Sequence, residues 1–192
     1  MKVCFEITLI GLGVLLDVIA GNAGFSIRLT AYLLFYIACT DSPRSALVGA
    51  VLAGMAQDLL LHRPILLTPF LLVFAVAAGW CLRRKHTTHL LEAALPGMAI
   101  GIANTLSDAL FLLWAGRPGF SSGTLLWQLL FHGTVGLLLL PGIIFLLDAL
   151  SGALDLGRFL DDNRPPLERR RWGSRPRTVK EHTVNPARGR KR

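Results

Sequence analysis

Charged residues are scarce in this 192-residue chain, where they make up 17% of the sequence. Soluble domains usually carry about 25%. Hydrophobic residues make up 53%, and the mean hydropathy is +0.53. The apolar residues form long runs instead of recurring at every third or fourth position. The composition therefore excludes an ordinary water-soluble globular domain and a disordered chain, and it indicates a polytopic membrane protein.

Cysteine is also rare. The three cysteines, Cys4, Cys39 and Cys81, lie in or beside apolar segments and form no CxxC pair. This spacing argues against a disulfide framework and against a structural metal centre. We expect the three thiols to be reduced and to pack as small hydrophobic side chains.

Catalytic motifs are missing as well: the sequence has no HExxH and no phosphate-binding loop. Gly119–Gly123 matches the GxSxG pattern, but it joins two apolar segments and lacks the strand–turn–helix context of a nucleophile elbow. His86 and His89 lie in a basic loop without further metal ligands nearby. We therefore expect no catalytic residues, no bound metal and no cofactor, and an enzyme is the weaker class.

Six apolar segments are candidates to cross a membrane, and the connections between the first four are very short. Short connections make sequential helices antiparallel neighbours. The sequence therefore predicts an all-α polytopic membrane protein, with a six-transmembrane-helix bundle over residues 1–155 and a separate tail over residues 156–192. The expected spans are Val3–Ala20, Phe25–Thr40, Ser45–Leu61, Ile65–Leu82, Leu90–Ala115 and Leu125–Leu150.

The positive charge is concentrated in the tail. Residues 1–155 carry eight basic and eight acidic residues, whereas residues 156–192 carry twelve basic and four acidic ones. With both termini in the cytoplasm, 17 of the 20 Lys and Arg residues fall on the cytoplasmic side. The positive-inside rule favours this orientation. A second interpretation stays open, in which the first apolar segment is a cleaved signal peptide.

The tail is rich in Arg, Pro and Gly, and from about Gly157 we expect it to be disordered, apart from a first turn that could continue the last helix. Near a bilayer, such a segment is expected to contact anionic lipids or an acidic cytoplasmic partner. Its arginine-rich part, residues 164–192, has a single aromatic residue, Trp172, which argues against single-stranded nucleic acid as the ligand. The candidate contact residues are Arg169, Arg170, Arg171, Arg175 and Arg177.

Two small-residue patterns predict close helix packing. Ala46, Ala50, Gly54 and Asp58 recur every four residues and share one helix stripe, and Gly97–Gly101 forms a GxxxG motif. Small residues let a neighbouring backbone approach closely. We expect these seams to pack against other helices, including the membrane helix of a partner.

Ionisable residues at membrane depth are costly, so each is a candidate for function. Asp17 and Arg28 flank one turn and are expected to pair. The intramembrane polar group consists of Asp58, which is near the outer end of its span, and of Asn104, Asp108 and His132, which are deeper. Two interpretations stay open for this group: hydrogen-bonding between packed helices, or a site for a ligand, a proton or an ion.

The stretch from Phe25 to Arg84 resembles the rod shape-determining protein MreD family. That family has an apolar span with a tyrosine near its end, a short polar turn, and a helix of the form G-x-x-x-G-x-x-x-D-L-L followed by a turn with proline. Two features differ here: the two glycines are five residues apart, and Ile65–Leu67 replaces the family's Leu-Gly pair. The matching residues are Gly49, Gly54, Asp58, Leu59, Leu60 and Pro64.

The resemblance implies a non-catalytic protein of the bacterial inner membrane that helps to maintain rod shape. Such proteins bind the bitopic protein MreC, in a complex that links the MreB filament to peptidoglycan synthases. The family is also similar in fold to the substrate-binding subunits of energy-coupling vitamin importers. The alternative function is therefore a small-molecule-binding membrane subunit of a transporter, with Asp58, Asn104, Asp108 and His132 around a cavity.

Overall fold

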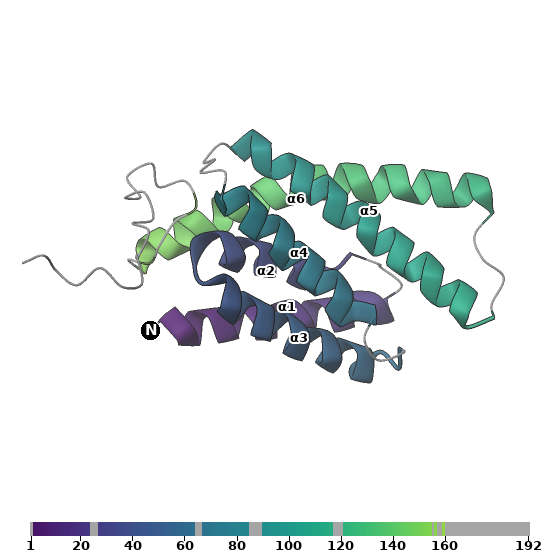
Figure 1. Cartoon of the computed structure of the whole chain (residues 1–192), viewed down its shortest axis with the longest axis horizontal. Helices are drawn as coiled ribbons and strands as arrows, with labels where there is room; N and C mark the ends of the chain where they lie inside the picture. Colours follow the sequence, from purple (N-terminus) through teal and green to yellow (C-terminus); the bar gives the residue numbers. More distant parts are fainter. Residues whose placement is uncertain are drawn as a thin grey trace, which may run out of the picture. The chain divides into compact units, whose positions relative to one another are not determined.

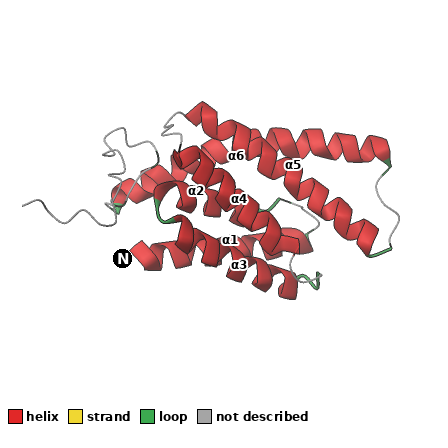
Figure 2. Ribbon diagram, in the orientation of Figure 1, coloured by secondary structure: helices red, strands yellow, loops and turns green. Residues whose placement is uncertain are grey.

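The computed structural model describes residues 2–23, 27–63, 67–84, 90–116 and 121–154, together with Leu156 and Phe159. Its secondary structure in these ranges is entirely helical (Figures 1 and 2). The six helices correspond in order to the six expected apolar segments. They are α1 (Lys2–Asn22), α2 (Leu29–Thr40), α3 (Pro43–Leu60), α4 (Leu67–Arg84), α5 (Leu90–Trp114) and α6 (Ser122–Ala153).

Four helices, α1, α4, α5 and α6, are long and apolar enough to cross a membrane. The other two differ from the expected spans. Helix α2 has 12 residues, which corresponds to about 18 Å, whereas the bilayer core is about 30 Å thick. Helix α3 has 18 residues but includes the polar side chains of Arg44, Gln57 and Asp58. By length and composition alone, the helices therefore provide four membrane spans and not the six that we expected.

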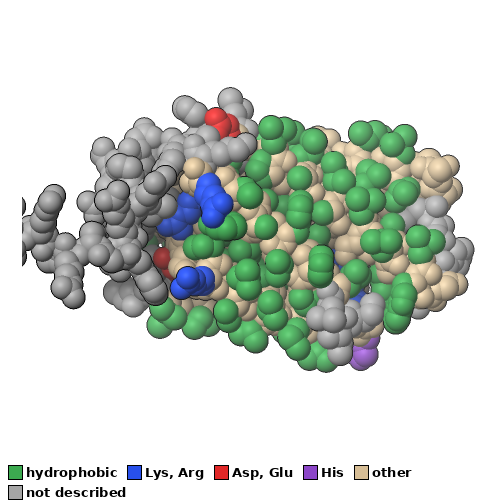
Figure 3. All heavy atoms as spheres, in the orientation of Figure 1, with side chains coloured by type: hydrophobic (Ala, Val, Ile, Leu, Met, Phe, Trp, Pro, Cys, Tyr) green, Lys and Arg blue, Asp and Glu red, His purple; other side chains and the backbone are tan. Residues whose placement is uncertain are grey.

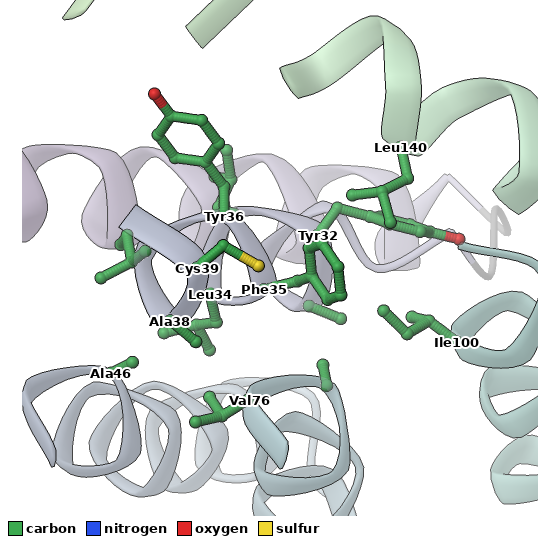
Figure 4. Packing of buried hydrophobic residues seen from close by; sticks show 14 of the residues in the cluster. Tyr32, Leu34, Phe35, Tyr36, Ala38, Cys39, Ala46, Val76, Ile100 and Leu140 are labelled. Atoms are coloured by element: carbon green, nitrogen blue, oxygen red, sulfur yellow. The ribbon is translucent and has the colours of Figure 1, made fainter. Parts of the chain in front are cut away.

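Helix α2 lies at the centre of the bundle and contacts each of the other five helices. All ten residues from Thr30 to Cys39 are buried. Figure 4 shows Ala46 and Val76 on one side of α2, and Leu140 and Ile100 near Tyr32. A helix that is apolar on every side is buried on every side. This short helix therefore forms the core on which the longer helices pack.

The longer helices keep much of their apolar surface outside. Of the apolar window in α1 only 17% is buried, and of that in α6 only 22%. Figure 3 shows hydrophobic side chains spread over the visible face of the helices. Exposing so much apolar surface to water is unfavourable, whereas contact with lipid acyl chains is not. The exterior is therefore that expected of a membrane protein.

Local capping residues fix several helix ends. The Ser42 side chain accepts a hydrogen bond from the Arg44 backbone at 3.3 Å, and Pro43 occupies the first turn of α3. At the other end of α3, His62 adopts a left-handed conformation (φ 52°), and the Arg63 N–H bonds the Asp58 carbonyl at 2.9 Å. This C-cap is of the type usually made by glycine, and it turns the chain at Arg63.

The chain beyond α6 packs against the body of the bundle at Phe159. The chain divides into a unit of Met1–Asp162 and a second unit of Asn163–Arg192. Phe159 belongs to the first unit and is only 4% exposed within the hydrophobic core. The part of the tail that we expected to be disordered from about residue 157 therefore includes a residue that packs into the core.

Candidate functional site

Asp17 holds the N-terminal end of α2. Its Oδ1 accepts the backbone N–H of Leu29, and its Oδ2 accepts that of Thr30 at 3.0 Å. The Gln57 amide donates to the same Oδ2 and to the Thr30 hydroxyl, both at 2.9 Å. Carboxylates are favoured at this position, because the first N–H groups of a helix have no partner within the helix. Asp17, Thr30 and Gln57 are all buried, so α1, α2 and α3 are joined by one polar network.

Arg28 does not pair with Asp17, contrary to the expectation from their spacing. Its Nη2 bonds Asp108 Oδ1 at 2.8 Å, and Arg63 Nη1 reaches the same oxygen at 3.3 Å. The two arginines come from the α1–α2 and α3–α4 connections, while Asp108 belongs to α5. This three-residue ion cluster joins both connections to α5. It also neutralises part of the positive charge of Arg28 and Arg63, which lie at the same end of the bundle.

Asp148, in α6, joins elements of the chain near the C-terminal end of α2. Its Oδ1 accepts the Tyr36 hydroxyl at 2.7 Å and the Phe159 backbone N–H at 2.7 Å. The Tyr36 hydroxyl also lies 3.1 Å from the Ser151 hydroxyl. Because these groups are buried, their hydrogen bonds replace those that water would otherwise provide. The network ties α2 to α6 and fixes the start of the tail.

The Ala46–Asp58 stripe is a seam within the chain. Ala46, Ala50, Gly54 and Asp58 are all buried. A Cβ added to Gly54 would lie 2.5 Å from the backbone of Pro69 in α4. The Thr68 N–H donates to Asp58 Oδ2 at 3.3 Å. The C-terminal part of the stripe, Gly54 and Asp58, therefore packs against α4.

The GxxxG motif forms the second internal seam, between α5 and α6. A Cβ added to Gly97 would collide with the Gly136 carbonyl oxygen, and one added to Gly101 would collide with that of His132. Thr105 bridges the same helices, since its hydroxyl lies 2.8 Å from His132 Nδ1. The two helices thus approach backbone to backbone, as small residues allow.

The location of these seams corrects the expected partner interface. We expected the Ala46–Asp58 stripe, through Ala50 and Gly54, and the Gly97–Gly101 motif to receive a partner's membrane helix. Both are occupied by helices of this chain, so a partner would have to displace α4 or α6 to reach them. A partner helix therefore needs another face of the bundle.

Neither of two cavities in the described part of the chain is lined by the four intramembrane polar residues. Asp58 accepts from Thr68, Asp108 binds two arginines and His132 contacts Thr105. Asn104 is only 5% exposed and takes part in an interaction of its own. One cavity, of about 20 Å³, is lined by Phe5, Glu6, Tyr36, Ile37, Thr40, Asp41, Ser151 and Leu156. The other, of about 580 Å³, lies between α4 and α5.

The GxSxG serine has a structural role in helix capping. Ser121 precedes α6, and its hydroxyl accepts the Thr124 N–H at 3.3 Å and lies 2.8 Å from the Thr124 hydroxyl. The candidate lipid-contacting residues of the tail lie outside the described residues. They are Arg169, Arg170, Arg171, Arg175 and Arg177.

Sequence reasoning missed Gln57, Tyr36 and Phe159. Gln57 immediately precedes Asp58, and an amide at membrane depth is as much a polar outlier as a carboxylate, so it could have been found. Tyr36 carries a polar hydroxyl near the end of an apolar span and could also have been noticed. Phe159 is an isolated aromatic residue in a polar segment, and the sequence does not indicate what it packs against.

Comparison with protein-family models, with curated proteins and with solved structures gives no match to this chain. The functional argument therefore depends on the residues and on their geometry.

Proposed function

We propose that this chain is a non-catalytic scaffold of the bacterial inner membrane, of the MreD type, in the machinery that elongates rod-shaped cells. Its partner is an MreC-like protein with a single membrane helix, which connects it to peptidoglycan synthases and to MreB. Both termini lie in the cytoplasm, and α2 and α3 complete a six-helix membrane domain around the central core.

The observation that supports this proposal is that the buried carboxylates bind other elements of the same chain. Asp17, Asp108 and Asp148 each hold two or more elements of the chain together. A rigid bundle with an apolar exterior is suited to binding other membrane helices. This favours the scaffold over the transporter-subunit alternative, which requires polar groups directed at a ligand.

The ion cluster also supports the proposed orientation. Arg28 and Arg63 lie at one end of the helices and share Asp108. Arg44 and Arg84 lie at the other end and are exposed. The exposed arginines are therefore at the end of the bundle that holds the N-terminus of α1 and the C-terminus of α6. The positive-inside rule assigns this end to the cytoplasm.

The proposed docking face for the partner is the exposed side of α1. Among the four membrane-length helices, α1 has the highest hydropathy and the smallest buried share. Cys4, Thr8 and Gly11 are exposed, and their spacing places them on one face. A Cβ added to Gly11 would meet no atom within 4 Å. Three small residues on a free face would let a partner's backbone approach closely.

The test is co-purification from native membranes in mild detergent, with identification by mass spectrometry. We expect a single-span periplasmic protein and cell-wall synthases to accompany the chain. Gly11→Leu should reduce their recovery at least tenfold, because the larger side chain keeps the partner backbone away. Gly142→Leu on α6 is the matched control, since Gly142 is also exposed with open space around it, and its recovery should be unchanged.

Two results would count against the proposal. Recovery of transport ATPase subunits without wall proteins would indicate the transporter-subunit alternative. Equal recovery with Gly11→Leu and Gly142→Leu would remove α1 as the docking face while leaving the scaffold role to be judged from the identity of the partners.

A further inference from the structure

Helices α5 and α6 each contain a Pro-Gly pair, Pro96–Gly97 and Pro141–Gly142. The two pairs lie at the same level of the hairpin, because a Cβ added to Gly97 would be 2.8 Å from the Cβ of Leu140, the residue before Pro141. Proline donates no helical hydrogen bond, and glycine is the weakest helix former apart from proline. Each pair is therefore the point where its helix bends most easily.

The part of α6 that follows its Pro-Gly pair is fastened to the rest of the bundle. Ile144, Leu147 and Asp148 are all buried. Asp148 also accepts hydrogen bonds from Tyr36 in α2 and from the Phe159 backbone. This inner part of the hairpin is therefore held in place by both apolar and polar contacts.

The parts of α5 and α6 on the other side of the Pro-Gly pairs form the outer arm, Gly97–Trp114 and Ser122–Leu140. From Ser122 to His132, no side chain of α6 is buried. The two helices are instead joined to each other through the glycine seam and through the contact of the Thr105 hydroxyl with His132. If the outer arm moves, its two helices therefore move together.

The outer arm meets the body of the bundle with a polar stripe of α5. Ile100, Asn104, Ser107 and Asp108 share one face of the helix, and the first three are buried. Ser107 Oγ has no hydrogen-bond partner among the described residues. Because three of these four side chains are polar, parting the stripe from the body loses less hydrophobic stabilisation than parting an apolar seam. Water would hydrogen-bond the groups that become exposed.

The ion cluster at Asp108 holds the outer arm against the body. Arg28 and Arg63 bind its Oδ1 at 2.8 and 3.3 Å, and the Arg63 guanidinium lies 6.0 Å from the centre of the Phe111 ring. The side chains of Asp108 and Arg63 are 17% and 18% exposed, so water already reaches two members of the cluster. Asp108 lies about 17 Å along α5 from Gly97, so a bend of about 20° would move its carboxylate by about 6 Å. A movement of this size breaks both ion pairs.

We propose that the outer arm opens by bending at the two Pro-Gly pairs. In the open state the arm is separated from Arg28 and Arg63, and a polar crevice lined by Asn104, Ser107 and Asp108 is accessible to water. Helices α1 to α4 and the inner part of the hairpin stay in place. The proposed docking face on α1 belongs to the part that stays in place, so the opening does not depend on the scaffold function.

The experiment measures a distance between the arm and the body in the full-length protein in lipid nanodiscs. The method is double electron–electron resonance between two spin labels, after the three native cysteines have been replaced by alanine. The labels are attached at Leu113→Cys on the arm and at Leu59→Cys on α3, where the native side chains are 65% and 64% exposed. Asp108→Asn removes the charge that both arginines bind, and it should lengthen this distance by about 5–8 Å.

Two controls separate a hinge from a general loosening of the bundle. Glu92→Gln changes a carboxylate of α5 outside the ion cluster, and it should leave the distance unchanged. A second label pair, at Phe145→Cys and Leu52→Cys, reports on the inner part of the hairpin, and its distance should not change in Asp108→Asn.

The hinge and the crevice each have a test of their own. Pro96→Ala/Pro141→Ala restores a helical hydrogen bond in each helix, and it should reduce the distance change caused by Asp108→Asn at least twofold. Ser107→Cys measures access to the crevice, because the native side chain is only 7% exposed. Asp108→Asn should raise its rate of reaction with a charged maleimide at least tenfold.

The proposal is overturned if Asp108→Asn leaves either the arm distance or the reaction rate unchanged. An equal change in the inner label pair, or a distance change that the proline substitutions do not reduce, would also overturn it. If melting shows that Asp108→Asn is unfolded, Arg63→Gln takes its place with the same outcomes, because this variant keeps the shorter bond from Arg28.

Discussion

Replacing Asp17 with asparagine tests the role of the carboxylate that begins the central helix. In the native chain, two oxygens accept three donors, from Leu29, Thr30 and Gln57. Asparagine offers one oxygen and one NH₂ group, so at least one buried donor loses its acceptor. An unsatisfied buried donor costs about 1–3 kcal/mol. Loss of the negative charge at the helix N-terminus adds about 0.3–1 kcal/mol. We expect Asp17→Asn to lower the free energy of unfolding by about 1–4 kcal/mol.

The assay is unfolding by SDS titration in mixed micelles, followed by circular dichroism. Gln57→Leu removes one donor from the same network, so the two substitutions should be coupled by about 0.5–3 kcal/mol in a double-mutant cycle. Glu92→Gln is the control, since Glu92 lies outside the network and this change should cost less than about 1 kcal/mol. An Asp17→Asn protein as stable as the parent, or strictly additive effects with Gln57→Leu, would refute the reasoning.

Three further predictions concern the other contacts. Gly101→Leu should prevent α5 and α6 from packing and abolish a cooperative melting transition, whereas Gly123→Leu, where the added side chain meets open space, should melt like the parent. Arg28→Gln should lower the melting temperature more than Arg63→Gln, because Arg28 makes the shorter bond to the shared carboxylate and is the more buried of the two; equal melting temperatures would contradict this. Phe159→Ala should lower the free energy of unfolding by up to about 3–5 kcal/mol and make the start of the tail sensitive to limited proteolysis, because Phe159 is buried. Unchanged cleavage would argue against this burial.

The sequence predicts the helices well because a bilayer requires long apolar runs, and such runs are visible without any tertiary information. It does not predict that α2 is a core helix. An apolar segment such as Leu29–Thr40 has the same composition whether protein or lipid surrounds it. The expected span began at Phe25, whereas the helix begins at Leu29, because Ile27 and Arg28 lie outside it.

The polar contacts were harder to predict than the helices. Asp17 and Arg28 are close in sequence, but Arg28 binds Asp108, which is 80 residues away. The small-residue seams were found from spacing, yet spacing cannot say whether a seam receives a helix of the same chain or of a partner. Gly54 and Gly97 both meet backbone of this chain.

The most direct test of the proposed scaffold is site-specific photo-crosslinking in native membranes. A photo-crosslinking amino acid replaces Ile7 on the proposed face of α1 or, as the control, Phe145 on α6, and both side chains are largely exposed. The proposal predicts a crosslink from position 7 to a single-span cell-wall protein and none to that protein from position 145. Crosslinks to lipid alone from position 7, or to the same protein from both positions, would contradict it.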